Sequence, residues 1–145
     1  MVYVLLAEGF EEVEALTPVD LLRRAGVETR LVGVTGATVC GARGINVVTD
    51  LSMDEVDLAK ADMLVLPGGM PGTLHLEQSP AVACALETAR RQGAYVCAIC
   101  AAPSILGHKG LLRGRKAVCF PGYEQELEGA RVLTEPVVTD GTVIT

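Results

Sequence analysis

Short, continuous apolar runs recur along the chain, and such runs are typical of strands buried on both faces of a sheet. They lie at residues 2–7, 28–34, 63–67, 95–99 and 116–120, with further strands expected within 131–145. Residues 39–50 predict a short β excursion that turns at Gly41 and Gly44. The pair Asp140-Gly141 predicts a hairpin turn near the end of the chain.

Apolar positions at helical spacing predict two main helices between these strands. The first covers residues 13–25 and ends at Gly26. Pro18 lies inside it, so we expect a kink or a late start there. The second helix begins at Pro80 and ends before Gly93.

Strands that alternate with helices predict an α/β fold with a mostly parallel sheet covered on both faces. A length of 145 residues fits one domain, which we assign to residues 1–145. The chain stops at Thr145, at the end of a predicted strand. Because a doubly covered sheet normally needs another helix after such a strand, we expect the final helix to be missing and the domain to be truncated.

Composition and charge argue against several classes of partner. The formal net charge is −6 and aromatic residues are only 3%, so phosphate backbones are repelled and no nucleic-acid partner is expected. The run at 2–7 is too short for a bilayer, which needs about 20 residues, and it has no basic flank like a signal peptide, so we expect no membrane partner. Five scattered cysteines, an odd number, favour a reducing cytoplasm.

Three segments with polar or flexible residues follow strands of the predicted sheet, where ligands bind in open α/β folds. They are residues 8–14, 68–69 and 100–103. Cys100 ends a strand and a helix is predicted for 103–107, as in the nucleophile elbow of serine hydrolases. A thiol at a helix N-terminus meets free N–H groups and the positive end of the dipole, and both favour the reactive thiolate. A buried, inert cysteine is the alternative.

Two neighbouring features support a site at this edge of the sheet. Gly68-Gly69 lets the backbone approach a ligand closely and can present N–H groups to an oxyanion, although an ordinary turn has the same sequence. Glu11, Glu12 and Glu14 stand at a predicted helix start, where carboxylates stabilise the dipole. One of the three could instead face the thiol as a general acid/base, and the residues alone do not select it.

Several motifs stand in register along the chain and resemble the ThiJ/PfpI superfamily. They are Leu66-Pro67-Gly68-Gly69, Ala98-Ile99-Cys100-Ala101-Ala102-Pro103, Glu11-Glu12-Val13-Glu14, and Pro18-Val19-Asp20 followed by Arg23-Arg24-Ala25-Gly26. Within the superfamily the chain is most similar to the parkinsonism-associated deglycase branch, including its YajL-like bacterial members. The resemblance implies a flavodoxin-like three-layer sandwich with a mostly parallel central sheet, and a final helix that this chain lacks.

The resemblance also implies roles for individual residues. Cys100 is the implied nucleophile and oxidation-sensitive thiol, and Glu14 is the implied protonated partner that hydrogen-bonds it. Gly69, which follows Gly68, and Ala101 are implied to offer backbone N–H groups to an oxyanion.

Other implied features concern assembly and the absence of a base. Arg43 corresponds to an arginine near the dimer interface of the family, and Arg24 is a second candidate there, so a homodimer is expected. Phe120 stands where the eukaryotic branch carries a histidine, so we expect no imidazole to act as a general base.

The implied function is a cysteine-dependent stress-response enzyme that acts on reactive aldehydes or glycated groups, as a glutathione-independent glyoxalase or deglycase. The alternative is a redox-sensing chaperone in which Cys100 is oxidised without turnover, since both functions need the same thiol.

We expect no metal and no cofactor, because the cysteines lack paired ligand spacing and the glycines form no phosphate-binding fingerprint.

Other cysteine chemistries fit the sequence less well. A cysteine peptidase or an amidotransferase-like hydrolase needs a histidine beside the nucleophile. Only His75 and His108 exist, and His108 lies eight residues beyond Cys100, about 12 Å along a helix. Cys97 and Cys100 have the spacing of thioredoxins, but Cys97 falls inside the predicted strand, so the two side chains point to opposite faces.

Overall fold

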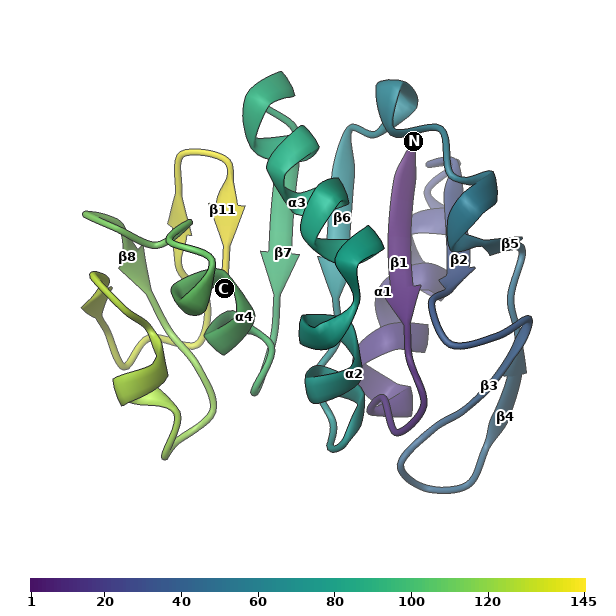
Figure 1. Cartoon of the computed structure of the whole chain (residues 1–145), viewed down its shortest axis with the longest axis horizontal. Coiled ribbons are helices and arrows are strands. Elements are labelled where there is room, and N and C mark those ends of the chain that lie inside the picture. The colour runs from purple at the N-terminus through teal and green to yellow at the C-terminus, as the bar shows by residue number, and fades with distance from the viewer.

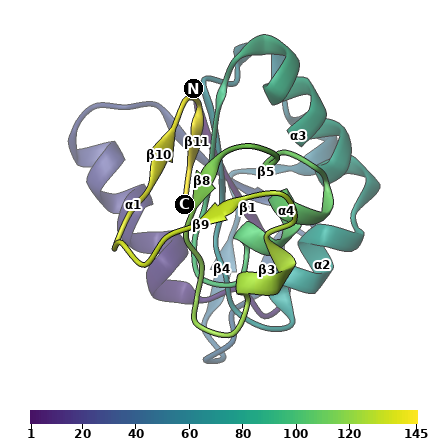
Figure 2. The same ribbon diagram turned by 90° about the vertical axis from the view of Figure 1, so that its left-hand side faces the viewer.

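The computed structural model describes all 145 residues. They form three layers, with a central sheet between two layers of helices (Figures 1 and 2). The strands of this sheet are β1 (Val2–Leu6), β2 (Thr29–Gly33), β5 (Leu51–Ser52), β6 (Met63–Leu66), β7 (Tyr95–Ala98), β10 (Thr139–Asp140) and β11 (Val143–Ile144). Two small sheets lie outside it, one of β3 (Thr38–Cys40) with β4 (Asn46–Val48), and one of β8 (Lys116–Ala117) with β9 (Arg131–Val132).

Four α-helices and three short 3₁₀ helices complete the fold. The α-helices are α1 (Glu12–Arg24), α2 (Gly72–Gln78), α3 (Pro80–Gln92) and α4 (Pro103–His108). The 3₁₀ helices are η1 (Met53–Glu55), η2 (Leu58–Lys60) and η3 (Glu124–Glu126). Figure 2 shows α1 on one side of the sheet and α2, α3 and α4 on the other.

The strand order is β10-β11-β7-β6-β1-β2-β5. Every neighbouring pair is parallel except β10 and β11, which pair antiparallel at one edge. This confirms the predicted α/β class with a mostly parallel central sheet between helices. The carboxyl ends of β1, β6 and β7 therefore meet at one edge, because these three strands are adjacent and run the same way.

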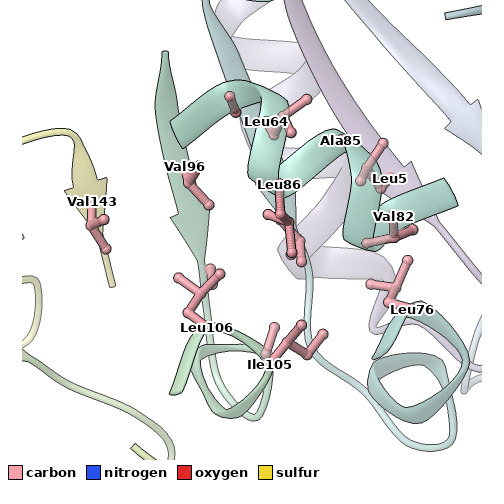
Figure 3. Packing of buried hydrophobic residues seen from close by; sticks show 14 of the residues in the cluster. Leu5, Leu64, Leu76, Val82, Ala85, Leu86, Val96, Ile105, Leu106 and Val143 are labelled. Atoms are coloured by element: carbon pink, nitrogen blue, oxygen red, sulfur yellow. The ribbon is translucent and has the colours of Figure 1, made fainter. Parts of the chain in front are cut away.

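The side chains of β1 alternate between the two faces of the sheet and pack in both hydrophobic clusters. Tyr3 and Leu5 belong to a cluster of 22 buried residues that also takes side chains from α2, α3 and α4 (Figure 3). Val2, Val4 and Leu6 belong to a second cluster of nine buried residues, beneath α1. Since successive side chains of a strand point to opposite faces, a continuous apolar run fits a strand that is covered twice.

The ends of the two longest helices follow local chemistry. Ser79 caps α3 by accepting a hydrogen bond from the Val82 N–H at 3.3 Å, and Gly93 ends it with φ of +73°. The helix α1 starts at Glu12 and contains Pro18, so the late start considered for it is wrong.

The C-terminal third departs from the sequence prediction in detail. The strand predicted for 116–120 is only β8, and it pairs with β9 outside the central sheet. The chain leaves β8 because the Val118 N–H bonds Thr145 Oγ1 and the Phe120 N–H bonds the Cys100 carbonyl. The sequence analysis also missed α2, a helix of seven residues.

Candidate functional site

Cys100 lies between the end of β7 and the start of α4, at the carboxyl edge of the sheet. Its φ of +62° makes it the one non-glycine residue of the chain in the left-handed region. Ala101 and Ala102 are buried at 3% and 0% exposure, so larger side chains would not fit beside the turn. Strained backbone of this kind costs about 1–3 kcal/mol and gathers at functional sites.

Glu14 reaches the same place from the first turn of α1. Its Oε2 accepts a hydrogen bond from the backbone N–H of Gly68 at 2.8 Å, directly after β6. A Cβ at Gly68 would lie 2.8 Å from this Oε2 and 3.1 Å from Cys100 Sγ, so the carboxylate and the thiol flank the glycine. Of the three acidic residues left open by the sequence, Glu14 is therefore the one that faces the thiol.

Glu11 and Glu12 have other partners. Glu12 is 5% exposed, and its Oε1 accepts hydrogen bonds from the N–H groups of Arg43 at 2.7 Å and Ile45 at 3.4 Å. Glu11 Oε2 lies 3.4 Å from Arg43 Nη2. Glu12 thus holds the β3–β4 turn against α1, a larger role than the dipole stabilisation expected for it.

Gly69 closes the site from the side of β6. It has φ of +89°, and a Cβ there would lie 2.4 Å from the Glu11 nitrogen, so only glycine fits. The Gly68 carbonyl accepts a hydrogen bond from the Glu11 N–H at 2.9 Å, and the Gly69 carbonyl accepts one from the Thr73 N–H at 2.9 Å. These bonds fix the glycine pair between α1 and α2.

The pKa of the Cys100 thiol is raised above its usual value. Burial is the main cause, and the Glu14 carboxylate adds to it through its charge and its hydrogen bond. The backbone N–H groups of Ala101 and Gly69 act in the opposite direction but do not outweigh it. Burial and the Glu14 side chain thus oppose the stabilisation that the helix N-terminus was expected to give the Cys100 thiolate.

Cys100 and Glu14 open into a cavity of about 460 Å³. Much of its wall comes from two later segments, residues 118–121 and 132–136, together with Ile99 and Thr145. The family resemblance pointed to Phe120 in the first of these segments, but nothing in the sequence indicated residues 132–136, which carry no catalytic motif. Within them, Cys119 and Phe120 are brought close by the hydrogen bond from the Phe120 N–H to the Cys100 carbonyl, at 2.8 Å.

Neither histidine lines this cavity. His75 lies on α2, with its Nδ1 2.7 Å from the Glu8 carbonyl oxygen. His108 is bound between the carboxylates of Glu77 and Glu126. A peptidase or amidotransferase would need an imidazole next to Cys100, so the geometry gives these two classes no support.

The remaining predicted residues lie outside the cavity. Arg24 pairs with Asp20 at 3.0 Å, and Arg43 pairs with Glu11; both arginine side chains are largely exposed. All five cysteines are free thiols, and burial raises the pKa of Cys97 to about 11. No group of three or more His, Cys, Asp or Glu side chains is arranged to hold a metal ion, and none of the helices has the length and apolar character to cross a membrane.

Comparison with known proteins gives consistent matches over the whole chain. The pattern of the DJ-1/PfpI family matches residues 1–145. Protein dj-1beta of Drosophila melanogaster is 35% identical over 146 residues, which span 98% of this chain and 78% of the fly protein. A protein named deglycase from Pyrococcus horikoshii is 36% identical over 146 residues, which span 97% of this chain and 85% of the archaeal protein.

Solved structures are similar to the same extent. A mutant of a DJ-1 superfamily protein from Salmonella typhimurium superposes with a TM-score of 0.93 at 34% identity, over 99% of this chain and 78% of the other. Oxidised DJ-1 of Toxoplasma gondii superposes with a TM-score of 0.92 at 34% identity, over 99% of this chain and 79% of the other.

Proposed function

Since the chain belongs to the DJ-1/PfpI family, we propose that it is a cysteine-dependent stress-response enzyme that acts on reactive aldehydes without glutathione. The observation that carries this proposal is the meeting of Cys100, Glu14 and the Gly68-Gly69 backbone at one cavity. Relatives of similar length are named deglycases, which supports aldehydes or glycated groups as the substrate class. Methylglyoxal, a two-carbonyl aldehyde, is the substrate we take for the mechanism.

The first step is attack by the thiol. Glu14 takes the proton from Cys100 as Sγ adds to the aldehyde carbon, and a hemithioacetal forms. The N–H groups of Gly69 and Ala101, which act on the sulfur at rest, are in position to stabilise the oxyanion that develops beside it. Starting from the thiol is consistent with its raised pKa, because the base that removes the proton is the carboxylate that raises it.

The second step moves a proton on the adduct. Glu14 first returns the thiol proton to the oxyanion, which completes the hemithioacetal. Glu14 then moves the proton from the former aldehyde carbon to the neighbouring carbon, while the hydroxyl proton passes from the first oxygen to the second, and the hemithioacetal becomes a thioester. Water then hydrolyses the thioester to lactate and restores the free thiol, so one methylglyoxal and one water give one lactic acid. No imidazole is needed in this sequence, in keeping with the cavity wall.

The test is turnover of methylglyoxal in the absence of glutathione, with lactate measured as product. We expect Cys100→Ser to abolish turnover and Glu14→Gln to lower kcat by about 10²–10⁴-fold, because the amide cannot accept the thiol proton. Cys97→Ser is the matched control, since Cys97 lies inside β7 with a raised pKa and should leave turnover unchanged. Full activity in Cys100→Ser would rule out the mechanism.

The second candidate is a redox-sensing chaperone that uses the same residue. One observation favours it: the Cys100 thiol is partly exposed in an open cavity, which peroxide can enter. Quantitative conversion of Cys100 to sulfinate, together with no methylglyoxal turnover, would favour the sensor over the enzyme. Either role needs a free thiol, so we place the protein in a reducing cytoplasm.

We also propose that the chain forms a homodimer through α1. Val13 and Leu21 on this helix are 66% and 60% exposed, and an open hollow of about 500 Å³ lies between the helix and Ile99. Arg24 and Arg43 are also exposed, as an interface role requires of them. Light scattering should give a dimeric mass that falls to the monomer in Leu21→Glu, whereas a monomeric wild type would contradict the proposal.

A further inference from the structure

A second thiol shares the cavity with Cys100. Cys119 lines the same wall, 19 residues further along the chain, and it has no part in the mechanism above. We propose that Cys119 is a resolving cysteine, which converts oxidised Cys100 into an intramolecular disulfide and makes its oxidation reversible. The inference rests on the reactive Cys100 of the proposed function and adds a modification site to it.

The backbone brings the two cysteines within range of each other. The Phe120 N–H donates to the Cys100 carbonyl at 2.8 Å. The trans peptide places the Cys119 Cα beside this N–H, so standard backbone dimensions keep the Cα atoms of Cys100 and Cys119 within about 7 Å of each other. Disulfides span Cα separations of about 4.4–6.8 Å.

The two cysteines also share the wall of one cavity. Cys100 and Cys119 both line the cavity of about 460 Å³, and both are half-buried free thiols. The remaining three cysteines, Cys40, Cys84 and Cys97, do not line it. Cys119 lies just after β8 ends at Ala117, in a segment without regular secondary structure. The pair can therefore close with little change in the strands around it.

The chemistry needs a hydroperoxide as the oxidant. Glu14 takes the proton from the Cys100 thiol as its sulfur attacks one peroxide oxygen, and the O–O bond breaks. The leaving oxygen takes up that proton, so the products are Cys100 sulfenic acid and water or an alcohol. The Cys119 sulfur then attacks the Cys100 sulfur, the S–O bond breaks, and the hydroxyl leaves as water with the Cys119 proton. The two thiols lose two electrons and two protons in total, and the peroxide gains them.

Electrostatics favour this order of events. Burial is the first cause that raises the pKa of Cys119, followed by the Glu124 carboxylate and the charge of Cys100. The charge that Cys100 carries once Glu14 has taken its proton therefore opposes ionisation of Cys119. Once Cys100 becomes a neutral sulfenic acid, its charge no longer opposes ionisation of Cys119, and attack becomes easier.

The competing fate is a second oxidation. Without a nearby thiol, a sulfenic acid reacts with further peroxide to give sulfinic acid, which ordinary thiols do not reduce. The proposal therefore predicts that Cys119 protects Cys100 from sulfinate. The protein should recover its reduced thiols, and with them its turnover, on treatment with dithiothreitol.

The experiment exposes the full chain to hydrogen peroxide, blocks free thiols with iodoacetamide and analyses tryptic peptides without reduction. Cys100 lies in the peptide 92–109 and Cys119 in the peptide 117–131. We expect these two peptides linked, two hydrogens lighter than their sum, in the wild type and also in Cys97→Ser, which removes the second cysteine of peptide 92–109. Cys119→Ser and Cys119→Ala should lose the linked species and carry sulfinate at Cys100 instead, and a melting curve verifies that each is folded.

Equal sulfinate at Cys100 in the wild type and in both Cys119 variants, with Cys119 alkylated in the wild type, would overturn the proposal. Turnover of methylglyoxal by the reduced protein separates this failure from failure of the proposed function. Turnover that depends on Cys100, without a disulfide, rejects only the resolving role. No turnover and no disulfide reject both.

Discussion

Replacing Gly68 with alanine measures how tightly the thiol and the carboxylate are packed. A Cβ at this position would lie 2.7 Å from Cys100 Cβ, 2.8 Å from Glu14 Oε2 and 3.1 Å from Cys100 Sγ. Non-bonded carbon atoms prefer about 3.5–4.0 Å, so something must move. The Glu14 carboxylate can rotate only by giving up its bond to the Gly68 N–H, and Cys100 Cβ is held by a strained turn.

The size of the effect follows from these contacts. Inserting one methyl group into packed surroundings costs about 1–3 kcal/mol of folding free energy. Backbone strain adds nothing, since the φ of Gly68 is not in the left-handed region. A displacement of about 1 Å between reacting groups costs about 10²-fold in rate, so we expect kcat for methylglyoxal to fall by about that factor.

Three measurements on Gly68→Ala test the reasoning: the free energy of unfolding in urea, the iodoacetamide labelling rate of Cys100, and methylglyoxal turnover. Gly36→Ala is the matched control, because a Cβ there meets nothing closer than the Thr38 carbonyl oxygen at 3.6 Å. We expect the control to behave like the wild type. If Gly68→Ala matched the wild type in all three measurements, the close approach of Glu14 and Cys100 would be refuted.

Two further predictions concern stability. Glu12→Ala should lower the free energy of unfolding by about 1–3 kcal/mol, measured in urea at pH 7, because the part-buried N–H groups of Arg43 and Ile45 lose their charged acceptor. Burial opposes ionisation of Glu12, but the hydrogen bonds from backbone N–H groups outweigh burial and lower its pKa. The stability that Glu12 contributes is therefore full above about pH 4.5, and it is lost as the pH falls through the lowered pKa. His108→Gln should show the opposite pH dependence. The hydrogen bonds that His108 donates to the carboxylates of Glu77 and then Glu126 raise its pKa, so its contribution is full below about pH 6.5 and is lost as the pH rises through the raised value. Urea curves at pH 5.5 and 9 should show a destabilised His108→Gln only at the lower pH, and an equal loss at both would contradict the charge assignment.

Local chemistry allowed much of the architecture to be predicted. The apolar run that became β1, the helix α3 with Pro80 at its start and Gly93 at its end, and the sharp turn at Cys100 depend on neighbouring residues, so their sequence signals survive in the fold. The helix α2 was not predicted from the sequence, because its seven residues, GTLHLEQ, show no apolar positions at regular helical spacing. The strand predicted for 116–120 was longer than β8, because an apolar run does not show which backbone groups its own N–H and C=O groups will bond.

The sequence by itself determined the fold class and the residue types available for chemistry, because strand and helix periods, glycine turns and a cysteine at a strand end are local properties. The residues alone left three acidic neighbours open and only the family resemblance pointed to Glu14. The tertiary structure placed Glu14 and Cys119 beside Cys100, and it set burial and Glu14 against the helix N-terminus in the pKa of the thiol. These depend on distances between segments far apart in the chain. Burial and Coulomb interactions act through space, and a linear pattern does not encode the separations on which they depend.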